Sequence, residues 1–144
     1  MATLAAEKSW TDRDAATGVY ARKVLAYVDA IKETVERAKA PGFDASGWDE
    51  VAAMLDTEKF RRVGNDKAEM GWPVYRDLLM QWGTTTEFWS EFRRISEVGS
   101  RVFLELTEHN RPVGGEDVVV HSCTVYEFDE AGKLVHLDIY LQHD

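Results

Sequence analysis

The segment from Arg101 to Gln142 alternates between runs of strand-forming residues and short turns. The runs RVFLELTEHN, DVVVHSCTVYEF and KLVHLDIYLQ are rich in Val, Phe, Tyr and Thr, which favour pleated and half-buried strands. Gly114-Gly115 and Asp129-Glu130-Ala131-Gly132 separate the runs and suit the turns of antiparallel hairpins. This pattern predicts an antiparallel meander, against which the rest of the chain must pack.

A long amphipathic helix is expected between Thr11 and Ala40, because apolar residues recur there at helical spacing. Asp12 and Asp14 place negative charge where a helix start favours it. Pro41-Gly42 is expected to end the helix. The apolar stripe consists of Tyr20, Val24, Tyr27, Val28, Ile31 and Val35.

Four shorter elements are expected between this helix and the meander. A second helix begins near Ser46, and a short strand spans Lys59 to Val63. Pro73 suits the first turn of a third helix, Gly83 is expected to stop it, and Phe88 to Val98 alternates as a strand does. The inner face of the third helix comprises Tyr75, Leu78, Leu79 and Trp82.

The order of these elements predicts an α+β fold, with three helices on one side of a curved antiparallel sheet. A chain of 144 residues is expected to form one domain over residues 1–144, with residues 1–11 as a flexible N-terminal tail. No apolar run is long enough for a membrane helix, and the N-terminus does not resemble a signal peptide.

Charge and cysteine content narrow the classes of partner. The chain has 17 basic and 26 acidic residues and a net charge of −9, which argues against nucleic acid or an anionic membrane surface as partner. Its single cysteine, Cys123, excludes an intrachain disulfide and is expected to be a buried, inert thiol. A cytoplasmic protein is the expectation.

The chain resembles the NTF2-like superfamily, which includes ketosteroid isomerases, SnoaL-like polyketide cyclases and limonene-epoxide-hydrolase-like proteins. The resemblance covers about residues 20–142 and is strongest in four segments, which are Gly71–Trp82, Val102–Glu108, Val125–Val135 and Asp138–Leu141. It implies a cone-shaped sheet whose concave face is closed by the helices over a deep apolar pocket. It also implies pairing of two copies through the outer sheet face. The long first helix and the segment from Lys39 to Gly47 depart from the usual family pattern around the pocket entrance.

The catalytic residues of these families match this chain only in part. The Arg and two Asp residues of the epoxide-hydrolase-like proteins fall on Leu106, Glu108 and Ile139, so only one carboxylate is kept. The Asp base of the ketosteroid isomerases falls on Arg62, and the protonated acid on their sheet falls near Thr124. Their helical Tyr corresponds to Tyr27 across an insertion.

The orientation of Asp138 depends on the strand register, because a slip of one residue exchanges the two faces of a strand. Simple alternation points Val135, Leu137, Ile139 and Leu141 inward and Asp138 outward, toward a partner subunit. A β-bulge near Leu137 would instead turn Asp138 into the pocket, where SnoaL-like cyclases keep their acid.

Glu108, Arg62 and Tyr27 are candidate catalytic residues, and each has a plainer alternative. Glu108 could act as a general base or acid in the pocket, or it could lie in solvent at a strand end. Arg62 could pair with Glu108 or bind a ligand oxygen, or it could be a solvated surface residue. Tyr27 is expected to be buried, and its hydroxyl could donate to a ligand or to the backbone.

A small hydrophobic ligand is expected inside the cone, with no cofactor and no metal. His121 and His136 are interpreted as structural or interface residues, because no metal-ligand spacing surrounds them. The expected catalytic residues are Glu108, Asp138, Arg62 and Tyr27. The expected ligand contacts are Phe60, Trp72, Trp82, Leu106, Ser122, Thr124, Ile139 and Leu141.

The sequence thus favours a cofactor-independent acid–base enzyme acting on a small hydrophobic, oxygenated compound such as a polyketide, terpenoid or steroid. The reaction would be an isomerisation, a cyclisation, a dehydration or an epoxide opening. The alternative is a non-catalytic module that binds a small ligand or serves in dimerisation. An outward face with Tyr126, His136, Asp138, Tyr140 and Gln142 would supply the interface for a homodimer.

Overall fold

A computed structural model describes residues 13–142. The expected flexible tail and the first residues of the expected long helix lie outside this range. The helical elements are η1 (Arg13–Ala15), α2 (Val19–Ala38), η2 (Ala45–Trp48), α3 (Asp49–Ala52) and α4 (Trp72–Thr85). The strands are β1 (Arg61–Val63), β2 (Glu69–Met70), β3 (Thr86–Val98), β4 (Arg101–Pro112), β5 (Val118–Phe128) and β6 (Leu134–Gln142).

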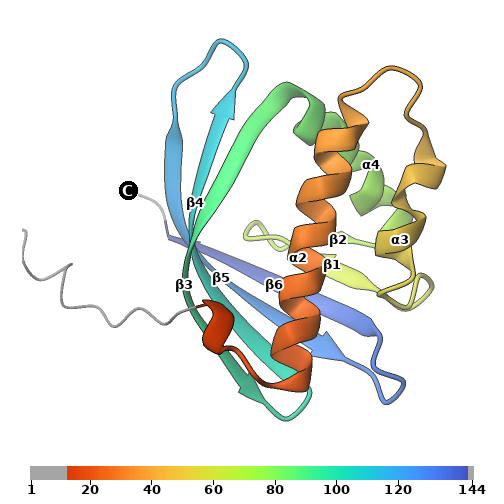
Figure 1. Ribbon diagram of the computed structural model, residues 1–144, viewed down its shortest axis with the longest axis vertical. Coiled ribbons are helices and arrows are strands. Elements are labelled where there is room, and N and C mark those ends of the chain that lie inside the picture. Colours follow the sequence, from red (N-terminus) through yellow and green to blue (C-terminus); the bar gives the residue numbers. More distant parts are fainter. Residues whose placement is uncertain (1–12, 143–144) are drawn as a thin grey trace, which may run out of the picture.

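The six strands form one curved sheet in the order β2-β1-β6-β5-β4-β3. The expected meander is present, because β3, β4, β5 and β6 pair antiparallel with their neighbours in sequence. Strand β1 pairs parallel to β6, so the sheet is mixed rather than wholly antiparallel. Helices α2, α3 and α4 gather on one side of the sheet (Figure 1). The predicted α+β architecture is confirmed.

Helix α2 begins later than the sequence pattern predicted. Its first residue is Val19, after the extended Gly18, whereas Asp14 belongs to the separate 3₁₀ turn η1. The backbone N–H of Ala21 donates to the carboxylate of Glu97 at 2.6 Å. This carboxylate, from the far end of β3, satisfies a free donor of the helix start and complements its positive dipole.

Two further helix predictions need correction. The second helix is only a 3₁₀ turn and one α-turn, which together run from Ala45 to Ala52. Gly83 does not stop α4, which continues to Thr85. A Cβ atom at Gly83 would lie 2.3 Å from Cγ1 of Val35, so this glycine permits the close approach of α4 to α2.

Three aromatic rings, from η2, from the segment before β1 and from α4, meet edge to face in the core. The centroid of Trp72 lies 6.1 Å from that of Trp48 and 6.2 Å from that of Phe60. Trp48 and Phe60 are almost fully buried, and burying each such side chain contributes about 1.5–3 kcal/mol. This cluster fixes the helices at one end of the sheet. None of the helices in the described range combines the length and hydrophobicity required to cross a membrane.

Candidate functional site

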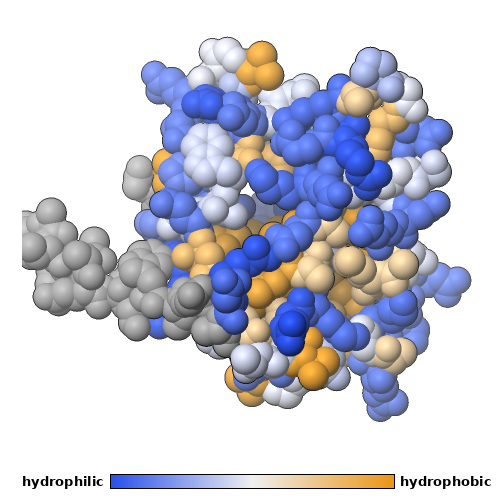
Figure 2. Space-filling view, viewed as in Figure 1, coloured by the Kyte–Doolittle hydropathy of each residue, from blue (hydrophilic) through white to orange (hydrophobic). Residues whose placement is uncertain are grey.

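A cavity of about 410 Å³ lies between the concave face of the sheet and helices α2 and α4. In Figure 2 the surface between α2 and β3 is hollowed, and apolar side chains gather beside the hollow. The apolar wall of the cavity is supplied by Val28 and Ile31 of α2, Leu78, Leu79 and Trp82 of α4, Phe88 of β3, Leu106 of β4, and Leu137, Ile139 and Leu141 of β6.

The strand register orders the cavity from a closed end to a mouth. At the closed end Tyr126 is paired with Leu137, and both side chains are buried. Thr124 with Ile139 forms the next inward pair, and Leu106 lies further toward the mouth. Glu108 follows Leu106 by two residues on β4, so the two side chains share the inner face.

The polar residues that line the cavity include Tyr27, Arg62, Tyr75, Glu108 and Tyr126, which come from five different elements. Lys32, Ser90, His109, Asn110 and Thr124 also line it. Burial raises the pKa of Tyr27 well above its usual range, and Tyr75 and Tyr126 raise it further. Burial also raises the pKa of Tyr75 and Tyr126, and the negative charge of Glu108 adds to both shifts. The three tyrosines are therefore neutral hydroxyl groups near neutral pH, able to donate hydrogen bonds.

Two of these polar groups make no hydrogen bond of normal geometry within residues 13–142, although the Tyr75 hydroxyl lies close enough to both to affect their electrostatics. The Tyr27 hydroxyl and the Arg62 Nε are buried without a hydrogen bond that meets normal geometry. The Arg62 guanidinium carbon lies 5.3 Å from the centroid of the Tyr75 ring, and its charge offsets part of the rise in the pKa of Tyr75. Buried polar atoms normally have partners, so these two are available to a bound molecule.

Glu108, Arg62 and Tyr27 all line the cavity, as the inward alternatives of the sequence analysis required. Glu108 and Arg62 do not form an ion pair with each other. Among the expected ligand contacts, the cavity wall includes Trp82, Leu106, Thr124, Ile139 and Leu141.

Three expected ligand contacts lie outside the cavity wall. Phe60 and Trp72 do not line the cavity; they are buried and pack against Tyr75, which does. Ser122 is paired with Leu106 on β4 and Leu141 on β6 and is covered there, although its hydroxyl has no partner in the described chain.

Asp138 is not brought to the cavity. A bulge is present in β6, but it falls at Val135, since Glu127 pairs with His136 and Phe128 pairs with Leu134. From His136 onward the ladder is regular, so Leu137, Ile139 and Leu141 point inward and Asp138 points outward. Its carboxylate lies 3.1 Å from Nε2 of His136 on the convex face. A bulge is thus present two residues before Leu137, but it does not turn Asp138 into the pocket, so the inward alternative for Asp138 is wrong.

The site contains two tyrosines that the sequence analysis did not select. Tyr126 was expected to face outward, yet it shares the parity of Thr124 and is buried in the cavity. Tyr75 was recognised as part of an inner helix face but was given no polar role. Counting strand parity from Thr124 would have identified Tyr126, whereas the position of Tyr75 depends on how α4 meets β1.

The remaining candidates lie on the convex face. His121 accepts from or donates to the Thr107 hydroxyl at 3.2 Å, and His136 contacts Asp138. Cys123 is half-buried, and burial raises the pKa of its thiol, so it has little thiolate character. Within residues 13–142 there is no cluster of three or more His, Cys, Asp or Glu side chains suited to hold a metal ion.

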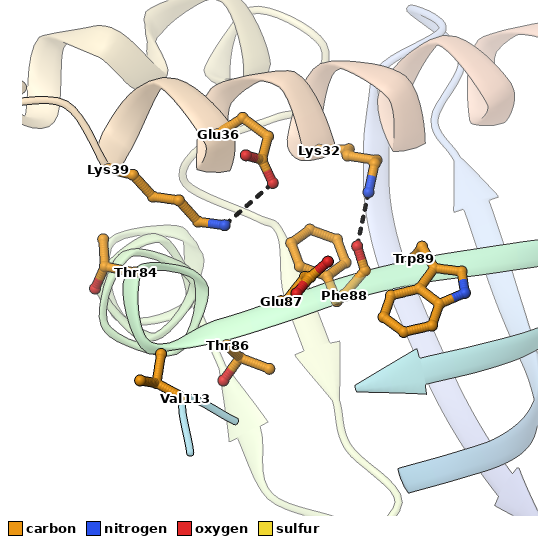
Figure 3. A pocket seen from close by; sticks show the side chains of 9 residues that line it. All are labelled: Lys32, Glu36, Lys39, Thr84, Thr86, Glu87, Phe88, Trp89 and Val113. Carbon is orange, nitrogen blue, oxygen red and sulfur yellow. Dashed lines mark hydrogen bonds and ion pairs between the residues drawn. The ribbon is translucent and has the colours of Figure 1, made fainter. Parts of the chain in front are cut away.

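The mouth of the cavity adjoins a second hollow of about 490 Å³ (Figure 3). Lys32, Phe88 and Trp89 line both spaces. The Lys32 ammonium donates to the Phe88 carbonyl oxygen at 2.7 Å and lies 4.7 Å from the Phe88 ring centroid. The outer hollow also carries an ion pair between Lys39 and Glu36, with a distance of 3.2 Å.

No protein-family model matches this sequence, and neither does any curated protein. Solved structures do match. A SnoaL-like polyketide cyclase from Agrobacterium tumefaciens superposes with a TM-score of 0.65 at 18% identity, covering 88% of this chain and 93% of that chain. The chain has the NTF2-like fold.

Other structures with the NTF2-like fold match similarly. An LEH-like epoxide hydrolase from M. tuberculosis has a TM-score of 0.62 at 20% identity, covering 84% of each chain. An NTF2-like protein of unknown function from Cytophaga hutchinsonii has a TM-score of 0.61 at 14% identity, covering 89% of this chain and 94% of that chain. These superpositions establish the NTF2-like fold. Sequence identities this low do not establish a reaction, which must be argued from the residues of the cavity.

Proposed function

We propose that this NTF2-like protein is a cofactor-independent acid–base enzyme that acts on a small hydrophobic, oxygenated compound. The observation that carries the proposal is the presence of the Glu108 carboxylate and the buried, neutral hydroxyl groups of Tyr27 and Tyr75 in one apolar cavity open to solvent. Similarity to a SnoaL-like polyketide cyclase and an LEH-like epoxide hydrolase supports the same class of reaction.

Glu108 is the proposed general base. A carboxylate can remove a proton from carbon next to a carbonyl group, and the electron pair then moves onto the carbonyl oxygen. Tyr27 and Tyr75 can donate hydrogen bonds to that developing oxyanion, and Arg62 adds positive charge at the same end of the cavity. Return of the proton at another position completes an isomerisation, while attack by the carbanion within the substrate completes a cyclisation.

Replacing Glu108 with Gln is expected to lower turnover about 100-fold or more, because the amide has similar shape but cannot accept the proton. A panel of hydrophobic ketones, β-keto esters and epoxides would be followed by NMR in D₂O, which reports both conversion and exchange at the α-carbon. Glu127→Gln is the matched control, since Glu127 is an exposed residue of β5 on the convex face. Equal turnover by the Glu108→Gln variant would remove Glu108 from the mechanism.

The alternative function is ligand binding without chemistry. It is supported by the aliphatic residues Leu106 and Ile139 and by Arg62, which occupy the places where the resemblance implied catalytic acids or an arginine. Under this alternative the panel would bind without conversion or exchange in the unmodified protein.

The chain is further proposed to form a homodimer through the convex face of the sheet. Val119 and Tyr140 are exposed there, with 47% and 58% of their surface accessible. Because the cavity opens on the opposite, helical side, such pairing would leave its mouth free.

A further inference from the structure

Arg62 has an uncommon environment for an arginine of this chain. It belongs to β1, it is half-buried, and it lines the closed half of the cavity beside Tyr75. Four other arginines of the described range are paired with acids, namely Arg13 with Asp29, Arg76 with Asp77, Arg94 with Glu105 and Arg111 with Glu87. Arg62 has no carboxylate within ion-pair distance in residues 13–142, although acids outnumber bases by 26 to 17.

A guanidinium keeps its charge throughout the physiological pH range. Holding such a cation partly out of water is unfavourable unless an anion compensates it. The Asp66 carboxylate and one terminal nitrogen of Arg62 both lie beside Gly64, but the two groups are not within ion-pair distance. The planar N–H groups of a guanidinium match the two oxygens of a carboxylate, which can accept two parallel hydrogen bonds. The buried Arg62 Nε, which has no partner, is one of those donors.

Two hydroxyl groups lie next to this guanidinium. Tyr75 is in contact with Arg62, and Tyr27 is 4% exposed with an unpartnered hydroxyl. Burial raises the pKa of both tyrosines, so both remain neutral donors. The charged guanidinium and the two neutral hydroxyl groups together suit a carboxylate, in which one negative charge is shared by two oxygens.

Two further charges of the cavity wall, Glu108 and Lys32, bear on the direction of a bound anion. The Lys32 ammonium is already held at the mouth by the Phe88 carbonyl oxygen and ring, which leaves the carboxylate of Glu108 to oppose Arg62. Glu108 lies toward the mouth, beyond the inward pair of Thr124 and Ile139, whereas Arg62 pairs with Leu137 at the closed end. An anionic group would be repelled near Glu108 and attracted near Arg62. The apolar residues between them would cover the uncharged body of the molecule.

We propose that the cavity binds a hydrophobic monocarboxylate, whose carboxylate is held by Arg62, Tyr27 and Tyr75 and whose apolar body extends toward Glu108. The inference rests on the proposed function only for what Glu108 does to that molecule, and the binding claim stands separately. It narrows the substrate class to acids, with the reacting carbon placed between the carboxylate and the cavity mouth.

The test compares 4-phenylbutanoate with 4-phenylbutan-1-ol, which share a skeleton and differ in charge. Binding to the full chain is measured by calorimetry and by the fluorescence of Trp82 and Trp89, which line the cavity. The acid is expected to bind roughly 10- to 100-fold more tightly than the alcohol, as hydrogen bonds to charged groups allow. Arg62→Gln is expected to abolish this preference, because it weakens binding of the acid much more than binding of the alcohol.

Arg61→Gln is the matched control. Arg61 is the preceding residue of the same strand, is exposed, and donates to the Phe60 carbonyl oxygen at 2.7 Å without lining the cavity. If Arg62→Gln does not unfold cooperatively, Arg62→Lys serves instead, because lysine keeps the positive charge but lacks the planar pair of N–H donors. Arg62→Lys is expected to lower the affinity for the acid and not that for the alcohol. Equal affinity of the unmodified protein for acid and alcohol would overturn the inference, as would equal effects of the Arg61 and Arg62 substitutions.

Failure of this inference can be told apart from failure of the proposed function. Glu108→Gln is expected to keep or increase affinity for the acid, since it removes a negative charge from the cavity, and a loss of acid affinity in this variant would count against the binding orientation. Acid preference without turnover of any panel compound supports the inference and contradicts the enzyme. Turnover that depends on Glu108, together with no acid preference, supports the enzyme and contradicts the inference.

Discussion

His109 links the two strands and the loop that border the cavity mouth. Its ring lies between two carboxylates, with Nε2 2.9 Å from Glu91 and Nδ1 3.2 Å from Asp117. It also stacks on Trp89 with 4.9 Å between ring centroids. These hydrogen bonds to Glu91 and Asp117 raise the pKa of His109 above its usual value.

The raised pKa sets the sign of a pH effect on stability. Because the folded state holds the proton more tightly than the unfolded chain, the stabilisation is complete below about pH 6.5, the ordinary pKa of His. It is lost as pH rises through the higher pKa of the folded state. His109→Phe keeps the ring that stacks on Trp89 and removes both ion pairs. The melting temperature of this variant should fall below that of the unmodified protein at pH 5.5, and the two should converge by pH 9. A gap that widens with pH would contradict the assignment.

The inward set of cavity residues was largely predictable, because strands alternate with a period of two. Leu106, Glu108, Ile139 and Leu141 all follow from that period once the meander is assigned. Asp138 could not be settled in this way, since one inserted residue reverses every later side chain. The insertion falls at Val135, and nothing in the local sequence distinguishes that position from Leu137.

Among the secondary-structure elements, α4 combines a conformationally unfavourable residue with a tight contact. Gly83 lies inside the helix and is buried against Val35 of α2. Replacement of a helical Gly with Ala ordinarily stabilises by about 1 kcal/mol. Here the new Cβ would lie 2.3 Å from Val35 Cγ1, and overpacking of this kind costs about 1–3 kcal/mol.

Gly83→Ala is therefore expected to destabilise the protein by about 1 kcal/mol in urea unfolding, against the usual helix propensity. In the Gly83→Ala background the further change Val35→Ala should cost less than it does alone, because the smaller side chain relieves the contact. Independent, additive effects would show that the two helices are free to move apart at this point. A Gly83→Ala variant more stable than the parent would refute the packing argument.

The elements that sequence reasoning placed least well are those whose ends depend on distant contacts. Helix α2 starts at Val19, and its first turn is held by Glu97, whose carboxylate accepts a hydrogen bond from the Ala21 N–H. Glu97 and Ala21 are 76 residues apart in the sequence. From the sequence alone Gly83 is typical of a helix end. Its actual role, which is to let Val35 of α2 pack closely against α4, depends on a contact between distant residues. The meander was placed correctly because its turns are local, as at Gly99 and Gly132, where a positive φ favours glycine.

At the scale of the whole molecule, the two faces of the sheet have different roles. The concave face encloses the cavity with its polar groups, whose lack of partners lowers the stability of the empty protein. The convex face carries a row of apolar residues that the chain itself leaves partly uncovered, consisting of Phe103, Val119, Cys123, Val125 and Tyr140. Polar residues such as His136 and Asp138 border it, which is the pattern of an apolar interface core with a polar rim.

The proposed homodimer can be tested without disturbing the cavity. In a two-fold symmetric pair the same patch meets itself, so one Tyr140→Glu substitution places two new charges in the shared interface. At about 10 µM the unmodified chain is expected to scatter light as a dimer and the Tyr140→Glu variant as a monomer. Val74→Glu is the matched control, because Val74 is 59% exposed on α4, on the opposite side of the molecule. Both variants should retain the ligand affinity of the parent, since neither residue lines the cavity. A monomeric parent at this concentration would exclude the convex face as a stable interface between copies.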